Sequence, residues 1–151
     1  MNMKPVSRKR ERGSAMVEAA ICIPLLLVLM VGIFEVGRAY ETWQVLTNAA
    51  REGARMAVMP SSDVNTTRAL IREYMTNGQL TGAAAATVNI DEGASINVNG
   101  TAVSASLVTV DYPFQFIMLQ PIVRLVSPGA TVGGPITMRA TAVMRNEAAA
   151  P

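Results

Sequence analysis

One long apolar segment constrains this chain more than any other feature. It begins at Ser14, ends at Phe34 and contains a single charged residue, Glu18. As a helix, residues 14–34 would extend roughly 30 Å, which matches the hydrocarbon core of a bilayer. We therefore expect this segment to be a transmembrane helix.

The charges on either side of the segment predict its orientation. Residues 1–13 are strongly basic, and Glu11 is their only acid; the basic residues are Lys4, Arg8, Lys9, Arg10 and Arg12. Such an excess of positive charge stays on the cytoplasmic side of a membrane. We expect a disordered cytoplasmic leader over residues 1–13 and an extracytoplasmic domain over residues 35–151.

The helix is expected to continue beyond the membrane as an amphipathic helix. From residue 35 to residue 59, apolar and small residues recur at alternating steps of three and four, with Glu35 among the polar residues between them. The stripe consists of Val36, Ala39, Trp43, Leu46, Ala50, Gly53 and Ala57. Because the first break signal is Pro60, the whole helix would be about 70 Å long, and Pro24 is expected to bend it.

The remaining sequence predicts one short helix and three or four strands. The helix runs from Asp63 to Met75, with a cap at Ser62 or Asp63 and a stop at Asn77-Gly78. The strand candidates are residues 87–90, a hairpin over 96–103 turning at Asn99-Gly100, the alternating segment 108–116, and 136–145. Pro113 favours an edge position or an early end for the third of these strands. Residues 146–151 are expected to be a frayed tail.

These elements predict an α+β, pilin-like fold, in which a small antiparallel sheet packs against the helical part. Residues 116–126, from Phe116 to Val126, resist assignment. They are apolar enough to form core, a membrane-proximal contact or a subunit interface.

The composition disfavours catalysis. The chain has no histidine, and its one cysteine, Cys22, lies inside the apolar segment, so Ser-His-Asp triads, Cys-His pairs and His/Cys zinc sites are excluded. The acids Asp63, Asp91, Glu92 and Asp111 follow no motif spacing, and the only basic cluster lacks interleaved aromatic residues. We expect no enzyme activity, no cofactor, no metal and no nucleic-acid binding.

The junction of the leader and the apolar segment resembles a processing site. No small-residue cleavage site follows Phe34, so the apolar helix is expected to be retained. Gly13 ends the charged region, and Glu18 lies five residues later, where an acid is costly unless it is neutralised. Cleavage after Gly13 would expose the amine of Ser14, which could pair with Glu18 of a neighbouring subunit.

Several motifs together resemble the TadE-like family, the minor pseudopilins of tight-adherence (Flp-type) pilus systems. The similar segments are residues 12–18, 23–27, 32–38 and 48–55, with a further likeness over 140–147. The resemblance implies a single-pass protein of the bacterial inner membrane, with its C-terminal domain in the periplasm or outside the cell. It also implies cleavage by a prepilin peptidase, and work beside other pilins, a secretion ATPase and an outer-membrane pore.

One departure from the family keeps a second function open. Ala19 stands where processed members often have phenylalanine. The alternative is therefore an uncleaved, signal-anchored module for extracytoplasmic binding or adhesion.

The small residues Ala49, Ala50, Gly53 and Ala54 form a candidate helix-packing face. Such a face allows close approach of another part of the same domain or of a second subunit. Packing within the domain is the favoured interpretation.

Overall fold

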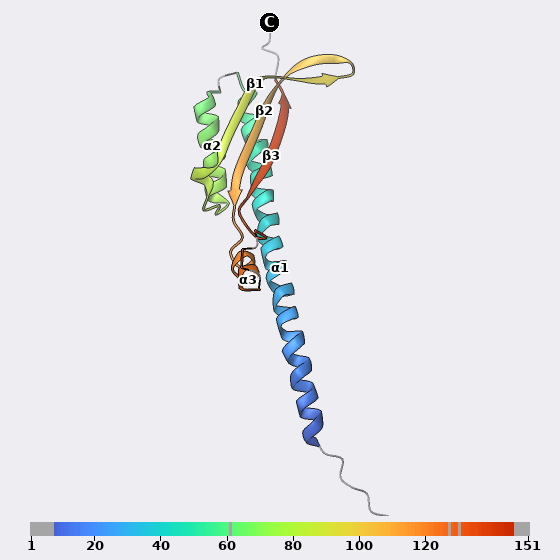
Figure 1. Ribbon diagram of the computed structural model, residues 1–151. Helices are drawn as coiled ribbons and strands as arrows, with labels where there is room; N and C mark the ends of the chain where they lie inside the picture. The colour runs from blue at the N-terminus through green and yellow to red at the C-terminus, as the bar shows by residue number, and fades with distance from the viewer. Residues whose placement is uncertain (1–7, 61, 127, 130, 147–151) are drawn as a thin grey trace, which may run out of the picture.

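The computed structural model describes residues 8–60, 62–126, 128–129 and 131–146. Its dominant element is α1 (Arg8–Ala57), a helix of 50 residues that passes through Pro24 without a break. The N-terminal half of α1 projects away from the rest of the molecule, whereas its C-terminal half is covered by the other elements (Figure 1). The expectation of disorder is wrong for residues 8–13, because α1 already begins at Arg8, and residues 1–7 lie outside the described residues.

A second helix, α2 (Val64–Asn77), packs beside the upper half of α1 (Figure 1). The Asp63 side chain caps it by accepting hydrogen bonds from the backbone amides of Asn65 and Thr66, at 3.1 and 3.2 Å. Gly78 ends it. These boundaries lie within two residues of the sequence prediction, because caps and stops are local signals.

The sheet contains three antiparallel strands in the order β1-β2-β3, which are β1 (Thr87–Val98), β2 (Thr101–Phe114) and β3 (Ile136–Arg145). A short 3-10 helix, η1 (Ala83–Ala85), precedes β1. The predicted hairpin turn is confirmed, since Asn99 and Gly100 both have positive φ, at 52° and 88°. β3 has the predicted bounds, and the α+β class is confirmed.

Two sequence-based strand bounds need correction, the end of β1 and the end of β2. β1 extends well beyond residues 87–90, because its outer half pairs with β2 after a register shift between Asp91 and Ala94. Pro113 is expected at an edge or at an early strand end, and the early end is confirmed, because β2 ends at Phe114 rather than at Phe116. The missing N–H of Pro113 is tolerated because β1 begins opposite Asp111, so that only β3 flanks β2 at this position.

The last described residue, Asn146, is also held more firmly than a frayed tail. Its backbone amide donates to the Ser104 carbonyl at 3.0 Å, and its side chain accepts from the buried Ser106 hydroxyl at 2.7 Å. The rest of the predicted tail, residues 147–151, lies outside the described residues.

One hydrophobic core joins α1, α2 and the inner face of the sheet. The predicted alternation in β2 is confirmed, because Val108, Val110, Tyr112 and Phe114 are all buried. The predicted stripe on α1 is only partly right. Val36 and Trp43 are exposed, while the buried residues of α1 are Glu35, Thr42, Leu46, Ala49, Ala50, Gly53, Ala54 and Ala57.

Gly53 sets the separation of α1 and α2. A Cβ added there would lie 2.6 Å from Cγ1 of the buried Ile71 and would also clash with its Cδ1. We expect Gly53→Ala to destabilise the fold by about 1 kcal/mol, because overpacking costs about 1–3 kcal/mol and the better helix propensity of alanine returns only about 1 kcal/mol.

Denaturation of the full chain in detergent micelles would measure this change. Gly37→Ala is the matched control, since a Cβ at Gly37 meets nothing within 4 Å. An equal or higher stability of Gly53→Ala than of Gly37→Ala would contradict the close-packing argument.

Candidate functional site

The proposed processing residues lie on the free end of α1. Gly13, Ser14 and Glu18 are all helical and exposed, and a Cβ on Gly13 would meet nothing within 4 Å. No part of the described domain covers this end of the helix (Figure 1). The peptide bond after Gly13 is therefore open to an external partner, although it lies in helical rather than extended backbone.

The apolar segment that follows has no partner in the described fold. Residues 14–30 are exposed throughout, and α1 contains an 18-residue window of mean hydropathy 2.6, none of which is buried. α1 is the one helix in the described ranges that is long and apolar enough to cross a membrane. An unpacked apolar helix of this length is unstable in water but matches the interior of a bilayer. It is a candidate membrane anchor, and Cys22 lies exposed within it.

The four small residues of the candidate packing face lie inside the domain. Ala49, Ala50 and Ala54 are completely buried, and Gly53 is buried against Ile71. In this arrangement, the small side chains let α1 approach α2 and the sheet closely.

The residue that the sequence did not single out is Glu35. It follows directly after the apolar segment and is only 1% exposed. Its Oε1 accepts hydrogen bonds from the backbone amides of Ile117, Met118 and Leu119, at 2.7, 2.5 and 3.4 Å. These amides stand at the N-terminus of α3 (Leu119–Val126), the structure adopted by most of the unassigned segment.

Glu35 therefore acts as a cap that comes from a different helix. Unpaired amides at a helix N-terminus attract a carboxylate, through direct hydrogen bonds and through the helix dipole. Arg38 completes the arrangement, since its Nη1 lies 2.8 Å from Oε2 of Glu35. We call Glu35, Arg38 and the three amides of residues 117–119 the Glu35 clasp.

The charge of Glu35 is stabilised despite its burial. Burial alone would raise the pKa of the carboxyl group. The hydrogen bonds from Met118, Ile117 and Leu119, together with the nearby Arg38 charge, outweigh that effect and hold the pKa below its ordinary value of 4.5. Glu35 is therefore ionised at neutral pH.

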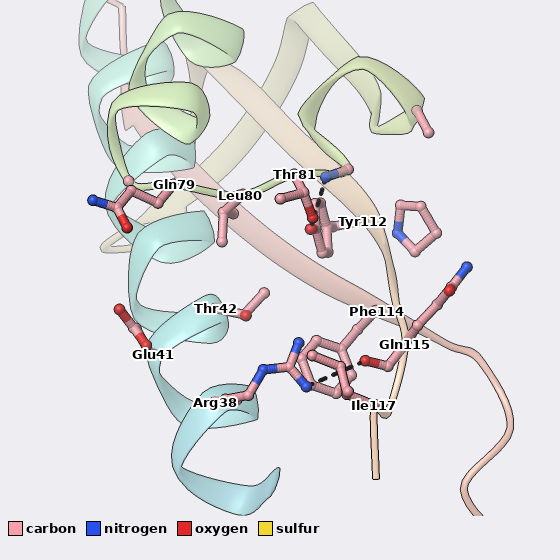
Figure 2. Close-up of a pocket in the computed structure, with 14 residues that line it drawn as sticks. Arg38, Glu41, Thr42, Gln79, Leu80, Thr81, Tyr112, Phe114, Gln115 and Ile117 are labelled. Carbon is pink, nitrogen blue, oxygen red and sulfur yellow. Dashed lines mark hydrogen bonds between the residues drawn. The ribbon is translucent and has the colours of Figure 1, made fainter. Parts of the chain in front are cut away.

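A pocket of about 540 Å³ lies next to the clasp, between α1, the segment leading from α2 to η1, and the end of β2 (Figure 2). The Arg38 guanidinium points toward Phe114 and Gln115, 5.2 Å from the centre of the Phe114 ring. Tyr112 is also engaged, because its hydroxyl accepts a hydrogen bond from the Gly82 amide at 3.1 Å. The charged residues among those that line the pocket are Arg38 and Glu41.

Three of the four candidate acids have separate structural roles, and the fourth, Glu92, is exposed. Asp63 caps α2, Asp91 accepts from the Gly93 amide at 3.0 Å, and Asp111 forms a two-bond ion pair with Arg139 on the neighbouring strand, at 2.7 and 3.0 Å. The hydrogen bond from Arg139 lowers the pKa of Asp111. Within the part of the chain that the structure describes, no three His, Cys, Asp or Glu residues gather in a way that could hold a metal ion.

Comparison with known proteins gives one match. No curated protein sequence and no solved structure matches this chain. The family model described as "TadE-like protein" matches residues 13–55, which extend from the glycine before the apolar segment to the buried face of α1. The resemblance found in the sequence motifs is thus confirmed over residues 13–55, where this chain is similar to TadE-like proteins.

Proposed function

We propose that this protein is a minor pseudopilin, anchored in the bacterial inner membrane, that takes part in assembling a Flp/Tad-type pilus. The observation that carries the proposal is α1, in which an apolar half, exposed over residues 14–30, continues without a break into the core of a small α+β domain. Such a helix can hold a subunit in a bilayer and later pack against the same helix of other subunits. The match to the TadE-like family supports the link to Tad/Flp pilus systems.

The proposed function has two stages, processing of the subunit and its assembly. The basic leader stays in the cytoplasm, and the domain from residue 35 onward lies outside it. A prepilin peptidase then cleaves after Gly13. Glycine is a poor helix former, so the first turns of α1 unwind at little cost when the peptidase binds.

Cleavage at this bond is tested by Gly13→Leu. We expect the variant to remain uncleaved, because a branched side chain replaces the hydrogen atom next to the scissile bond, and to migrate more slowly than the wild type. Mass spectrometry of the membrane-extracted wild-type protein should find a chain that begins at Ser14. Gly37→Leu is the matched control and should be processed normally, since Gly37 is also an exposed glycine of α1. A wild-type chain beginning at Met1 would refute processing and favour the uncleaved anchor.

The second stage depends on Glu18. After cleavage, the new amine of Ser14 on one subunit would pair with Glu18 on its neighbour, which neutralises both charges inside the membrane. We expect Glu18→Ala to be cleaved normally but to reduce the yield of pili severely. Glu18→Asp keeps the charge and should restore part of the yield. Normal pili in the alanine variant would remove the pairing role.

A further inference from the structure

The apolar surface around α3 has no partner among the residues that the structure describes. Ile117 and Met118 precede α3 and are 57% and 46% exposed, and Val132 follows it at 61%. The two segments meet at the first turn of α3, because Gly133 is so close that an added Cβ would lie 2.8 Å from the Gln120 amide nitrogen. We call Ile117, Met118 and Val132 the collar.

The Glu35 clasp fixes the position of the collar along the axis of α1. Glu35 is the first residue after the apolar segment, and it holds the amides of both Ile117 and Met118. The collar therefore lies where α1 would leave the hydrocarbon core. Within the domain, α3 is the element that reaches furthest toward the apolar half of α1 (Figure 1).

The surface of α1 at the same height has the chemistry of a membrane interface. Ile33 and Phe34 are exposed apolar residues just below Glu35. Tyr40, 60% exposed, lies six residues after Phe34, or about 9 Å along the helix, in the layer that the lipid headgroups occupy. Exposed tyrosines are typical of this layer. Arg124, exposed in the last turn of α3, adds a cation that can reach lipid phosphates.

We propose that the collar is a membrane-contacting surface, which inserts into the outer headgroup region of the same bilayer that α1 spans. The occupant is phospholipid, because the collar lies level with the end of the apolar segment, at a position set by the hydrogen bonds from Ile117 and Met118 to Glu35. Contact at a second point beside α1 would restrict the tilt and rotation of the domain relative to the membrane. The proposal rests on the membrane anchoring proposed above, and it adds a site that the anchor does not require.

Site-specific fluorescence tests the proposal on the full chain in vesicles of phosphatidylcholine and phosphatidylglycerol. In a Cys22→Ser background, a polarity-sensitive dye is attached at Ile117→Cys or Val132→Cys. Val98→Cys is the matched control, an exposed valine at the far tip of the β1-β2 hairpin. Lipids carrying a nitroxide near the headgroup should quench the two collar labels by roughly half and leave the Val98 label unaffected, since interfacial residues insert only about 5–10 Å. Aqueous iodide should show the opposite order.

The wild-type cysteine separates failure of this inference from failure of the anchor. A dye on Cys22 should be quenched by nitroxides deep in the acyl chains. Quenching of Cys22 combined with collar labels that behave like Val98 would overturn the collar proposal and leave the anchor intact. Collar labels shielded from both lipid and iodide, increasingly so at higher protein-to-lipid ratio, would also overturn it and would indicate a second protein chain as the occupant. An unquenched Cys22 would refute the anchor itself.

Discussion

Replacing Glu35 with alanine is expected to release α3 from α1 and to destabilise the domain by about 3 kcal/mol, because several charge-assisted hydrogen bonds are lost at once. Three backbone amides, of Ile117, Met118 and Leu119, would lose their common acceptor. Arg38 would lose its ion pair in a partly buried position. The truncated side chain also leaves a space between the two helices.

Hydrogen exchange of the full chain in micelles measures this effect where it should occur. The amides of residues 117–119 should exchange much faster in Glu35→Ala than in the wild type, while those in the centre of β2 change only with the global stability. Glu41→Ala is the matched control, because Glu41 is an exposed glutamate of the same helix and should change the stability by less than about 0.5 kcal/mol. Unchanged exchange at residues 117–119 would contradict the capping role.

The same site predicts that the domain loses stability when the pH falls. The pKa of Glu35 is lower in the folded chain than its ordinary value of 4.5, so its contribution is complete above that pH. As the pH falls through the lowered pKa, the carboxylate binds a proton and this stabilisation is lost. Glu35→Gln lacks the titration, so the stability difference between wild type and Glu35→Gln should be constant above pH 4.5 and shrink below it. A difference that grew on acidification would show that the sign is wrong.

Phe114→Ala is expected to cost about 3–5 kcal/mol, the range found when a buried phenylalanine is truncated and leaves a cavity. Phe114 is 2% exposed and stands at the last paired position of β2, opposite Ile136. Its ring packs edge to face against that of Phe116, with 5.2 Å between the centroids. The Arg38 guanidinium lies over the same ring in a cation–π contact. The substitution therefore loosens the end of the sheet that lies nearest the Glu35 clasp.

Thermal or chemical denaturation in micelles would measure the loss of stability. Phe34→Ala removes the same side chain from an exposed position of the apolar segment, so the unfolding midpoint of the domain should stay close to that of the wild type. Phe114→Leu, which keeps most of the buried volume, should lose much less stability than Phe114→Ala. A Phe114→Ala protein as stable as Phe34→Ala would contradict the packing described for this end of the core.

The fold could be predicted in large part because its signals are local. The α2 cap at Asp63, the turn at Asn99-Gly100 and the alternation over residues 108–114 each depend on a few neighbouring residues. The sequence could not give the length of β1, because the pairing of residues 94–98 depends on the register of β2. Pro113 left an edge position or an early end open, and only the structure shows that the central strand β2 ends one residue later.

The candidate sites also divide into those that local sequence signals predict and those that only the tertiary structure reveals. The apolar length of residues 14–34 and the basic charge before them follow from composition along the chain, and they predict an anchor without any knowledge of the domain. The predicted processing motif around Gly13 likewise depends only on neighbouring residues in the sequence. The role of Glu35 is different, because a glutamate on an amphipathic helix is usually a solvated residue. The one local signal at Glu35 is that Arg38 follows three residues later on the same helix, a spacing that favours ion pairs.

By itself, then, the sequence determined that the chain has one long apolar helix, a basic end and a small α+β domain, because hydrophobic periodicity, charge asymmetry and turn residues act over short distances. The tertiary structure alone decided that Glu35 is buried and that residues 117–119 lie against it, more than 80 positions further along the chain. The amides that stabilise its charge come from an element whose own sequence gave no assignment. Whether these amides contact Glu35 depends on how the sheet packs against α1. No local sequence pattern encodes a contact between residues so far apart in the chain.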